Sequence, residues 1–167
     1  MERNKKVVFV SHCLLNQNAR PVGKERFAGP FRDLINMFAE AGIGIVQLPC
    51  PQMEFNGGLN RRSKASTPAS GTYRNNCKKL SSNLIKQVEN YIKNDYKVVG
   101  ILGVEFSTTC AVHQTNNGRK NVPGKGVLIE EIEQEMQKKN FQVPIIGVNL
   151  NNTFSSVEKI QSLLDFS

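Results

Sequence analysis

The chain has 167 residues, of which 39% are hydrophobic and 22% charged, proportions typical of a single globular domain and not of a disordered or fibrous chain. Its formal net charge of +8 favours anionic partners, but the basic residues are scattered and no aromatic RNA-binding motif accompanies them. No apolar run approaches the roughly 18 residues that span a bilayer, and the apolar stretch near the N-terminus is too short for a signal peptide. We therefore expect a cytoplasmic protein that does not contact a membrane.

Short apolar runs alternate with amphipathic segments along the whole chain. The runs predict strands at 6–11, 43–48, 98–104 and 144–148. Apolar residues at helical spacing predict helices at 29–42, 76–94, 126–139 and 155–164. Between them we expect a long polar segment from 52 to 76 and a polar loop that reaches residue 121.

This alternation predicts the fold class. Helix-length connections between buried strands favour parallel pairing with right-handed crossovers. We expect a three-layer, Rossmann-like α/β fold, with a parallel sheet of about four to five strands and helices on both faces. One such domain would occupy residues 1–167.

Three of the predicted strands are followed by a cysteine. Cys13 comes after the first strand, Cys50 after the second and Cys110 after the third. Because parallel strands place all their carboxyl ends at one edge of the sheet, the fold would bring these distant thiols together where α/β sheets bind ligands.

A group of three thiolates binds zinc or the irons of an iron–sulfur cluster. Either metal would keep one position open for a substrate, as a catalytic site requires. The opposing interpretation is that each cysteine is merely buried, as free cysteine often is. We assign that structural role to Cys77, which has no strand before it.

Several polar residues share the predicted edge. His12 and His113 each neighbour one of the cysteines, as a fourth ligand, a proton donor or a loop residue without chemistry. Glu105 and Glu54 are candidate carboxylates for acid–base catalysis, and Ser107 is a candidate for orienting a substrate. Arginines and glycines add donors for a polar or anionic substrate, namely Arg20, Arg61, Arg62, and Gly124 with Gly126 before a helix.

Three motifs, taken together, resemble the 2-thiouracil desulfurase (TudS-like) family. That family opens with S-A-C-L-L-G, an arginine and a glycine; this chain has S-H-C-L-L-N-Q-N-A-R-P-V-G from Ser11. Its C-P-E followed by G-G-L corresponds to C-P-Q-M-E-F-N-G-G-L from Cys50. Its S-P-S-C before G-x-G-V corresponds to S-T-T-C from Ser107 and G-K-G-V from Gly124. The matches keep their order over roughly the first 130 residues.

The resemblance implies a [4Fe–4S] cluster held by Cys13, Cys50 and Cys110, and removal of sulfur from a thiolated nucleobase with release of sulfide and without a redox cofactor. In such an enzyme we expect Glu105 or Glu54 to activate water and Ser107 to orient the substrate, as their places at the predicted edge suggest. The residues we expect near the substrate are Ser11, His12, Arg20, Arg61, Gly124 and Gly126. Zinc remains the alternative metal.

Departures from the family pattern lie on the expected substrate side. Gln52 replaces a glutamate, His12 replaces an alanine, Thr108 replaces a proline, and the loop to Gly57 is two residues longer. We therefore expect a divergent TudS-related desulfidase with a small thiolated molecule as partner, and thiouracil itself is not assured. The alternative is a non-catalytic metal- or anion-binding module that contacts RNA; nucleic acid is otherwise the less favoured partner. A zinc hydrolase that uses His12 or His113 ranks lowest.

Overall fold

A four-stranded parallel sheet forms the centre of the molecule. The computed structural model describes residues 1–62 and 71–165. Strands β1 (Lys6–Val10), β2 (Gly44–Gln47), β3 (Lys97–Val104) and β6 (Ile145–Val148) pair in the order β2-β1-β3-β6. The chain adds β2 on one side of β1 and β3 on the other, so the strand order reverses between β1 and β3. Such a reversal is where open α/β sheets form their binding crevice.

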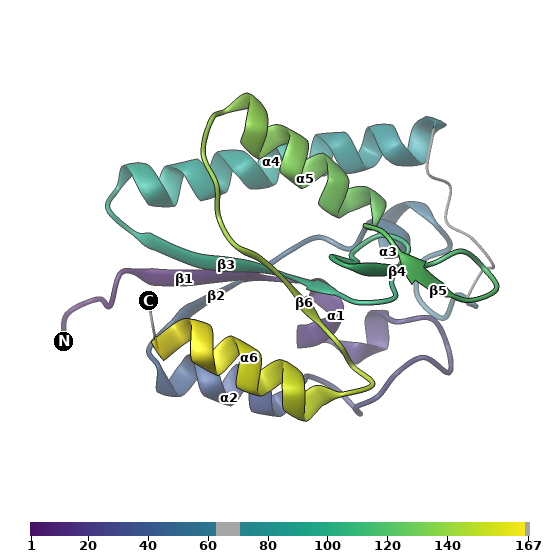
Figure 1. Ribbon diagram of the computed structural model, residues 1–167, viewed down its shortest axis with the longest axis horizontal. Helices are drawn as coiled ribbons and strands as arrows, with labels where there is room; N and C mark the ends of the chain where they lie inside the picture. Colours follow the sequence, from purple (N-terminus) through teal and green to yellow (C-terminus); the bar gives the residue numbers. More distant parts are fainter. Residues whose placement is uncertain (63–70, 166–167) are drawn as a thin grey trace.

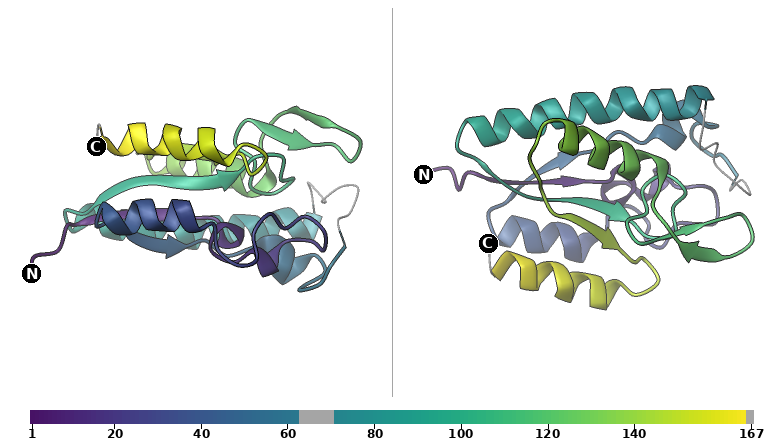
Figure 2. Two further views of the ribbon diagram at one scale, coloured as in Figure 1. Left: turned by 90° about the horizontal axis from the view of Figure 1, so that it is seen from below. Right: turned by 45° about the horizontal axis from the view of Figure 1, so that its top comes forward.

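Four helices cover the two faces of the sheet (Figures 1 and 2). Helices α2 (Arg32–Glu40) and α6 (Thr153–Asp165) lie on one face, and α4 (Gly71–Lys93) and α5 (Val127–Lys138) lie on the other. The predicted three-layer α/β fold is thus confirmed. In the described part of the chain, no helix combines the length and the apolar character that crossing a membrane requires.

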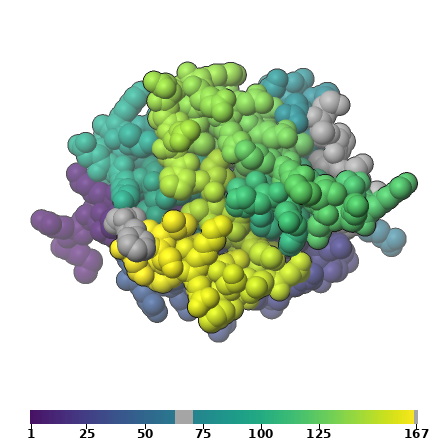
Figure 3. All heavy atoms as spheres, in the orientation of Figure 1, coloured from purple at the N-terminus to yellow at the C-terminus, as the bar shows by residue number. Residues whose placement is uncertain are grey.

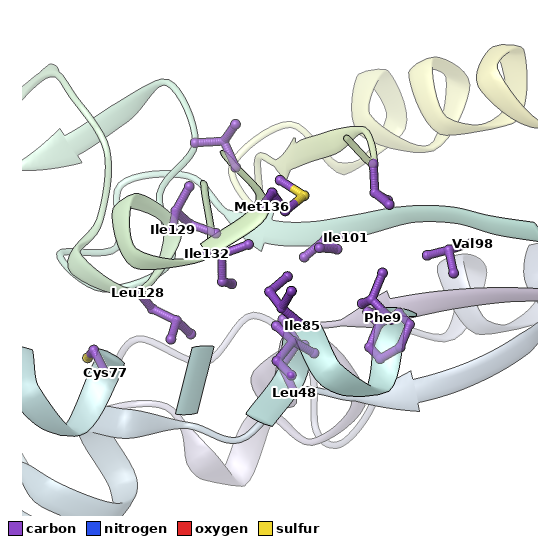
Figure 4. Packing of buried hydrophobic residues seen from close by; sticks show 14 of the residues in the cluster. Phe9, Leu48, Cys77, Ile85, Val98, Ile101, Leu128, Ile129, Ile132 and Met136 are labelled. Carbon is purple, nitrogen blue, oxygen red and sulfur yellow. The ribbon is translucent and has the colours of Figure 1, made fainter. Parts of the chain in front are cut away.

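The core has two halves because strand side chains alternate between the faces. Phe9 and Ile101 point toward α4 and α5, where they meet Ile85 and Leu128; Figure 4 shows this half, which also contains Cys77. On the other face, Val8 and Val10 of β1 and Leu102 of β3 belong to the half of the core that α2 and α6 cover. Leu34 and Phe38 of α2 are part of the same cluster. Strand β3 is buried along its whole length apart from Lys97, as expected for a central strand.

The structure corrects the predicted loops. The segment after Cys50 begins with helix α3 (Pro51–Phe55), and α4 starts at Gly71, five residues before the predicted start; residues 63–70 lie outside the described part. After β1 in the sequence, the chain forms one turn of helix, α1 (His12–Leu15), and a 3-10 turn, η1 (Gln17–Ala19). The loop before residue 121 contains an antiparallel hairpin, β4 (Gln114–Asn116) with β5 (Asn121–Pro123), which projects from the body (Figure 3).

Candidate functional site

The three cysteines that follow β1, β2 and β3 line one cavity at the carboxyl edge of the sheet. Cys13 lies in the single turn α1, Cys50 is the residue that caps the amino end of α3, and Cys110 lies in the turn after β3. The cavity has a volume of about 690 Å³. Its position coincides with the strand-order reversal between β1 and β3, so the fold brings together residues nearly one hundred positions apart along the chain.

Burial keeps the thiols of Cys13 and Cys110 protonated in the metal-free protein. Removal from water raises the pKa of Cys13 to about 11 and raises the pKa of Cys110 well above its ordinary value. The neighbouring thiols add to both shifts, because Cys50 acts on Cys13 and on Cys110 through its charge. The guanidinium of Arg20 opposes the shift at Cys13. Cys50 therefore lies close enough to both other cysteines to influence their protonation.

Within residues 1–62 and 71–165, no three His, Cys, Asp or Glu side chains lie close enough to hold one metal ion. A multi-iron cluster holds its cysteines farther apart than a single ion does, because each thiolate binds a different iron.

Two glycines fix the turn that carries Cys110. A Cβ atom added at Gly126 would come within 2.2 Å of the carbonyl carbon of Thr109, and one added at Gly103 within 2.3 Å of the Cys110 carbonyl oxygen. Backbone therefore packs directly on backbone from both sides. Ser107 closes the turn, since its Oγ accepts hydrogen bonds from the backbone N–H groups of Thr109 and Cys110 at 3.2 and 3.0 Å.

Basic side chains dominate the charge of the cavity. Six of the residues that line it are cations and one, Glu105, is a carboxylate: Arg20, Lys24, Arg26, Arg61, Arg62 and Arg119. In the described residues, Arg20 Nη1 is buried without a hydrogen-bond partner, and burial lowers the pKa of this guanidinium while the Cys13 thiolate raises it. An unpaired buried donor next to a thiol invites a negative partner.

Glu105 lines the cavity, but its carboxylate is already engaged. Oε1 accepts from the backbone N–H groups of Val112 and His113 at 2.7 and 2.9 Å, and Oε2 lies 3.1 Å from His113 Nδ1. The side chain of His113 faces a smaller, second cavity. Glu105 therefore fixes the loop after Cys110 and retains part of its accepting capacity for a cavity ligand.

Two predicted substrate residues, Ser11 and His12, and the predicted catalytic residue Glu54 lie outside the cavity lining. Ser11 is buried beneath Cys110, where its Oγ donates to the Leu102 carbonyl at 2.7 Å. The ring of His12 contacts Gln47 at 2.8 Å, and burial lowers its pKa while the nearby Glu54 raises it. Glu54 itself is exposed on α3. These three residues therefore border the site without facing into it.

The prediction that Gly124 and Gly126 open a helix end to an anion does not hold. The first backbone N–H groups of α5, those of Val127 and Leu128, donate to the carbonyls of Thr108 and Thr109. The helix end is thus occupied by the Cys110 turn, and Gly126 serves close packing. Arg61, in contrast, lines the cavity, although its guanidinium donates to the carbonyls of Ala19 and Gly58.

Sequence reasoning missed Gln52 as a contributor to the site. Gln52 lines the cavity, and its Nε2 donates to the hydroxyls of Thr108 and Thr109, both at 3.0 Å. The replacement of a glutamate at this position was the available signal, but its consequence depends on partners that only the folded chain supplies.

The fold and site define an αβα protein with a thiol-lined, basic cavity at the strand-order reversal. No family model matches the chain. Its sequence is 34% identical over 145 residues to the uncharacterized protein MJ0003 of Methanocaldococcus jannaschii, covering 86% of each protein. The chain belongs to the family of that protein.

A solved structure shares this fold. The [4Fe–4S]-dependent thiouracil desulfidase TudS matches over 95% of this chain and 99% of its own, with a TM-score of 0.54 and 18% sequence identity. The likeness shows a distant, TudS-like relation in fold.

Replacing Gly126 by alanine is expected to destabilise the protein by about 2 kcal/mol or more, because the new methyl group must displace the Thr109 backbone. Gly29→Ala is the matched control, since no atom lies within 4 Å of the added Cβ. Urea unfolding of both variants measures the difference. Equal stability of the two would show that the close packing does not constrain this turn.

Alkylation of Cys13 in the metal-free protein should be slow at pH 7 and should rise about tenfold per pH unit up to pH 10, because only the thiolate reacts and the pKa is about 11. Iodoacetamide labelling followed by peptide mass spectrometry measures the rate at each pH. The same peptide in urea-unfolded protein should level off near the ordinary cysteine pKa, about 8.5. A plateau at that pH in the folded protein would contradict the burial argument.

Proposed function

We propose that this chain is an iron–sulfur-dependent desulfidase that removes sulfur from a small thiolated compound, such as a thiouracil-like nucleobase, and releases sulfide. The observation that carries the proposal is the meeting of Cys13, Cys50 and Cys110 at one cavity. The shared fold with a [4Fe–4S]-dependent desulfidase supports it, as do the motifs around these cysteines. All four cysteines are free thiols, which suits a reducing cytoplasm.

The donor set fits a [4Fe–4S] cluster with three protein ligands. Cys13, Cys50 and Cys110 would hold it, and Arg20 Nη1, which has no hydrogen-bond partner among the described residues, offers a donor to the negative charge that three thiolates bring. When bound, such a cluster supplies one iron without a protein ligand, a Lewis acid that accepts sulfur.

The protein groups around this position then bind and orient the substrate. Ser107 uses its oxygen as a double acceptor within the turn, so its hydroxyl hydrogen can be donated to a substrate heteroatom in the cavity. Arg20 donates to a carbonyl or an anionic group of the substrate. Glu105 is the carboxylate that lines the cavity and is assigned the proton of the attacking water. Glu54 is less suited to this role, because it is exposed on α3.

A second candidate, a non-catalytic anion-binding module, is favoured by the excess of basic side chains in the same cavity. It predicts salt-dependent binding of RNA or of a phosphate compound and no sulfide release from any thiolated base. The two candidates differ in their metal content, so metal analysis separates them.

Anaerobic reconstitution of the wild-type chain with iron and sulfide should give a brown protein with about four iron atoms per chain. Cys13→Ser, Cys50→Ser and Cys110→Ser should each lose most of this iron, because a cluster with two remaining ligands is easily stripped. Cys77→Ala is the matched control and should load like the wild type, since Cys77 belongs to the core between the sheet and α4. Iron and sulfide analysis with electron paramagnetic resonance provides the measurement.

Loading that is equal in all three serine variants, or one zinc and no iron in the wild type, would rule out the proposed cofactor. Sulfide release from 2-thiouracil, 4-thiouracil and their nucleosides then tests the activity separately from the cofactor.

A further inference from the structure

We propose that Gln52 is a positioning residue that fixes the three cysteine-bearing segments relative to one another. It does so through a continuous set of hydrogen-bonded side chains, here called the polar chain: Arg61, Gln52, Thr108, Thr109 and Tyr73. The inference rests on the proposed function, because it assigns a purpose to the fixed positions of Cys13, Cys50 and Cys110.

The first end of the polar chain reaches the segment of Cys13. Arg61 is buried, and its Nη1 donates to the carbonyl of Ala19 at 2.7 Å. Ala19 ends the turn η1, whose first residue, Gln17, donates from Nε2 to the Cys13 carbonyl at 2.6 Å. The position of Arg61 is therefore tied to the turn that carries Cys13.

Gln52 forms the middle of the polar chain. It lies two residues after Cys50 in α3, and its Oε1 accepts from Arg61 Nη2 at 3.3 Å. Its Nε2 donates to both Thr108 and Thr109. One amide thus connects the Cys50 segment with Arg61 on one side and with the Cys110 turn on the other.

The other end of the polar chain is anchored in the core. Thr109 Oγ1 lies 2.7 Å from the hydroxyl of Tyr73 on α4, and both side chains are buried, at 1% and 6% exposure. A buried hydroxyl that loses its partner costs about 1–3 kcal/mol, so the native set of bonds is strongly preferred over a broken one. The Cys110 turn is held by this bond as well as by its two flanking glycines.

An amide suits the middle position because it donates and accepts at once. A leucine of similar size would leave Arg61 Nη2 and the threonine hydroxyls without this bridge. A glutamate could keep the connection, because it accepts from Arg61 and from threonine hydroxyls that turn to donate. The expected order of function is therefore Gln or Glu above Leu.

Amide hydrogen exchange of the metal-free protein tests the positioning role without any cofactor. In Gln52→Leu, peptides that cover 50–56 and 107–112 should exchange about tenfold faster, the effect of one or two lost hydrogen bonds. Gln52→Glu should exchange like the wild type. Gln161→Leu makes the same change on the exposed side of α6, where the amide donates to Asp165, and should leave both peptides unchanged.

Reconstituted protein gives the second readout. Gln52→Leu and the isosteric Thr109→Val should lose iron to a chelator about tenfold faster than the wild type and should broaden the paramagnetic resonance signal, whereas Gln52→Glu should restore both. Melting temperatures of the metal-free variants exclude general unfolding as the cause.

Unchanged hydrogen exchange in Gln52→Leu would overturn the inference, whether or not the wild type binds a cluster. A second outcome is that Gln52→Leu matches the wild type in exchange and in iron retention while the serine variants lose iron. That result would remove the positioning role and leave the proposed function intact. If Gln52→Leu exchanges faster but the wild type takes up no iron, the positioning role is supported and the proposed cofactor is ruled out.

Discussion

Contact between backbone and backbone at the Cys110 turn is the constraint on which the site depends. Gly126 before α5 approaches the Thr109–Cys110 peptide, and Gly103 on β3 approaches the Cys110 carbonyl, both too closely to admit a side chain. The carbonyls of this turn in turn accept the first N–H groups of α5, so the helix starts where the turn ends. A central strand, a helix and the backbone of a candidate ligand are thus joined with no side chain between them, so the Cys110 backbone is fixed relative to the helix.

The parallel sheet extends this constraint to the other two cysteines. Cys13 lies in α1 and Cys50 caps α3, each close after the end of a strand, and the two strands pair with defined register, Val10 beside Gln47. A strand that ends in a tight turn leaves its next side chain little freedom. The main sheet therefore sets the coarse positions, and the polar chain centred on Gln52 sets the finer ones. The two contributions differ because strand pairing fixes the backbone, whereas hydrogen-bonded side chains fix the loops.

The sequence was sufficient to predict the sheet, its parallel pairing and the meeting of three cysteines. Runs such as Val7–Val10 have one physical interpretation once helix-length connections separate them, and parallel pairing then leaves no choice of edge. The short elements were not predictable in this way. Helix α3 has five residues and the β4–β5 hairpin two strands of three, too little chain for a periodic pattern to develop.

Side-chain roles at the site were harder still to predict, because they depend on partners distant in sequence. Gly126 was interpreted as giving an anion access to the helix end. The structure instead explains the absence of a side chain at Gly126 by the Thr109–Cys110 peptide, sixteen or seventeen residues earlier in the chain, which packs against it. Glu105 was assigned to catalysis alone, but it also holds Val112 and His113. Local patterns contain no information on such contacts, which arise only when the turn after β3 folds back on the strand.

The cavity brings a protonated thiol and a guanidinium together. Burial keeps Cys13 protonated, and Arg20 Nη1 has no hydrogen-bond partner among the described residues. A buried donor left without a partner costs free energy. Binding of a soft metal would deprotonate the thiols and supply the missing negative charge next to Arg20. Arg20 would then stabilise the deprotonated, metal-bound thiols, so the proposed cofactor and this guanidinium would favour each other.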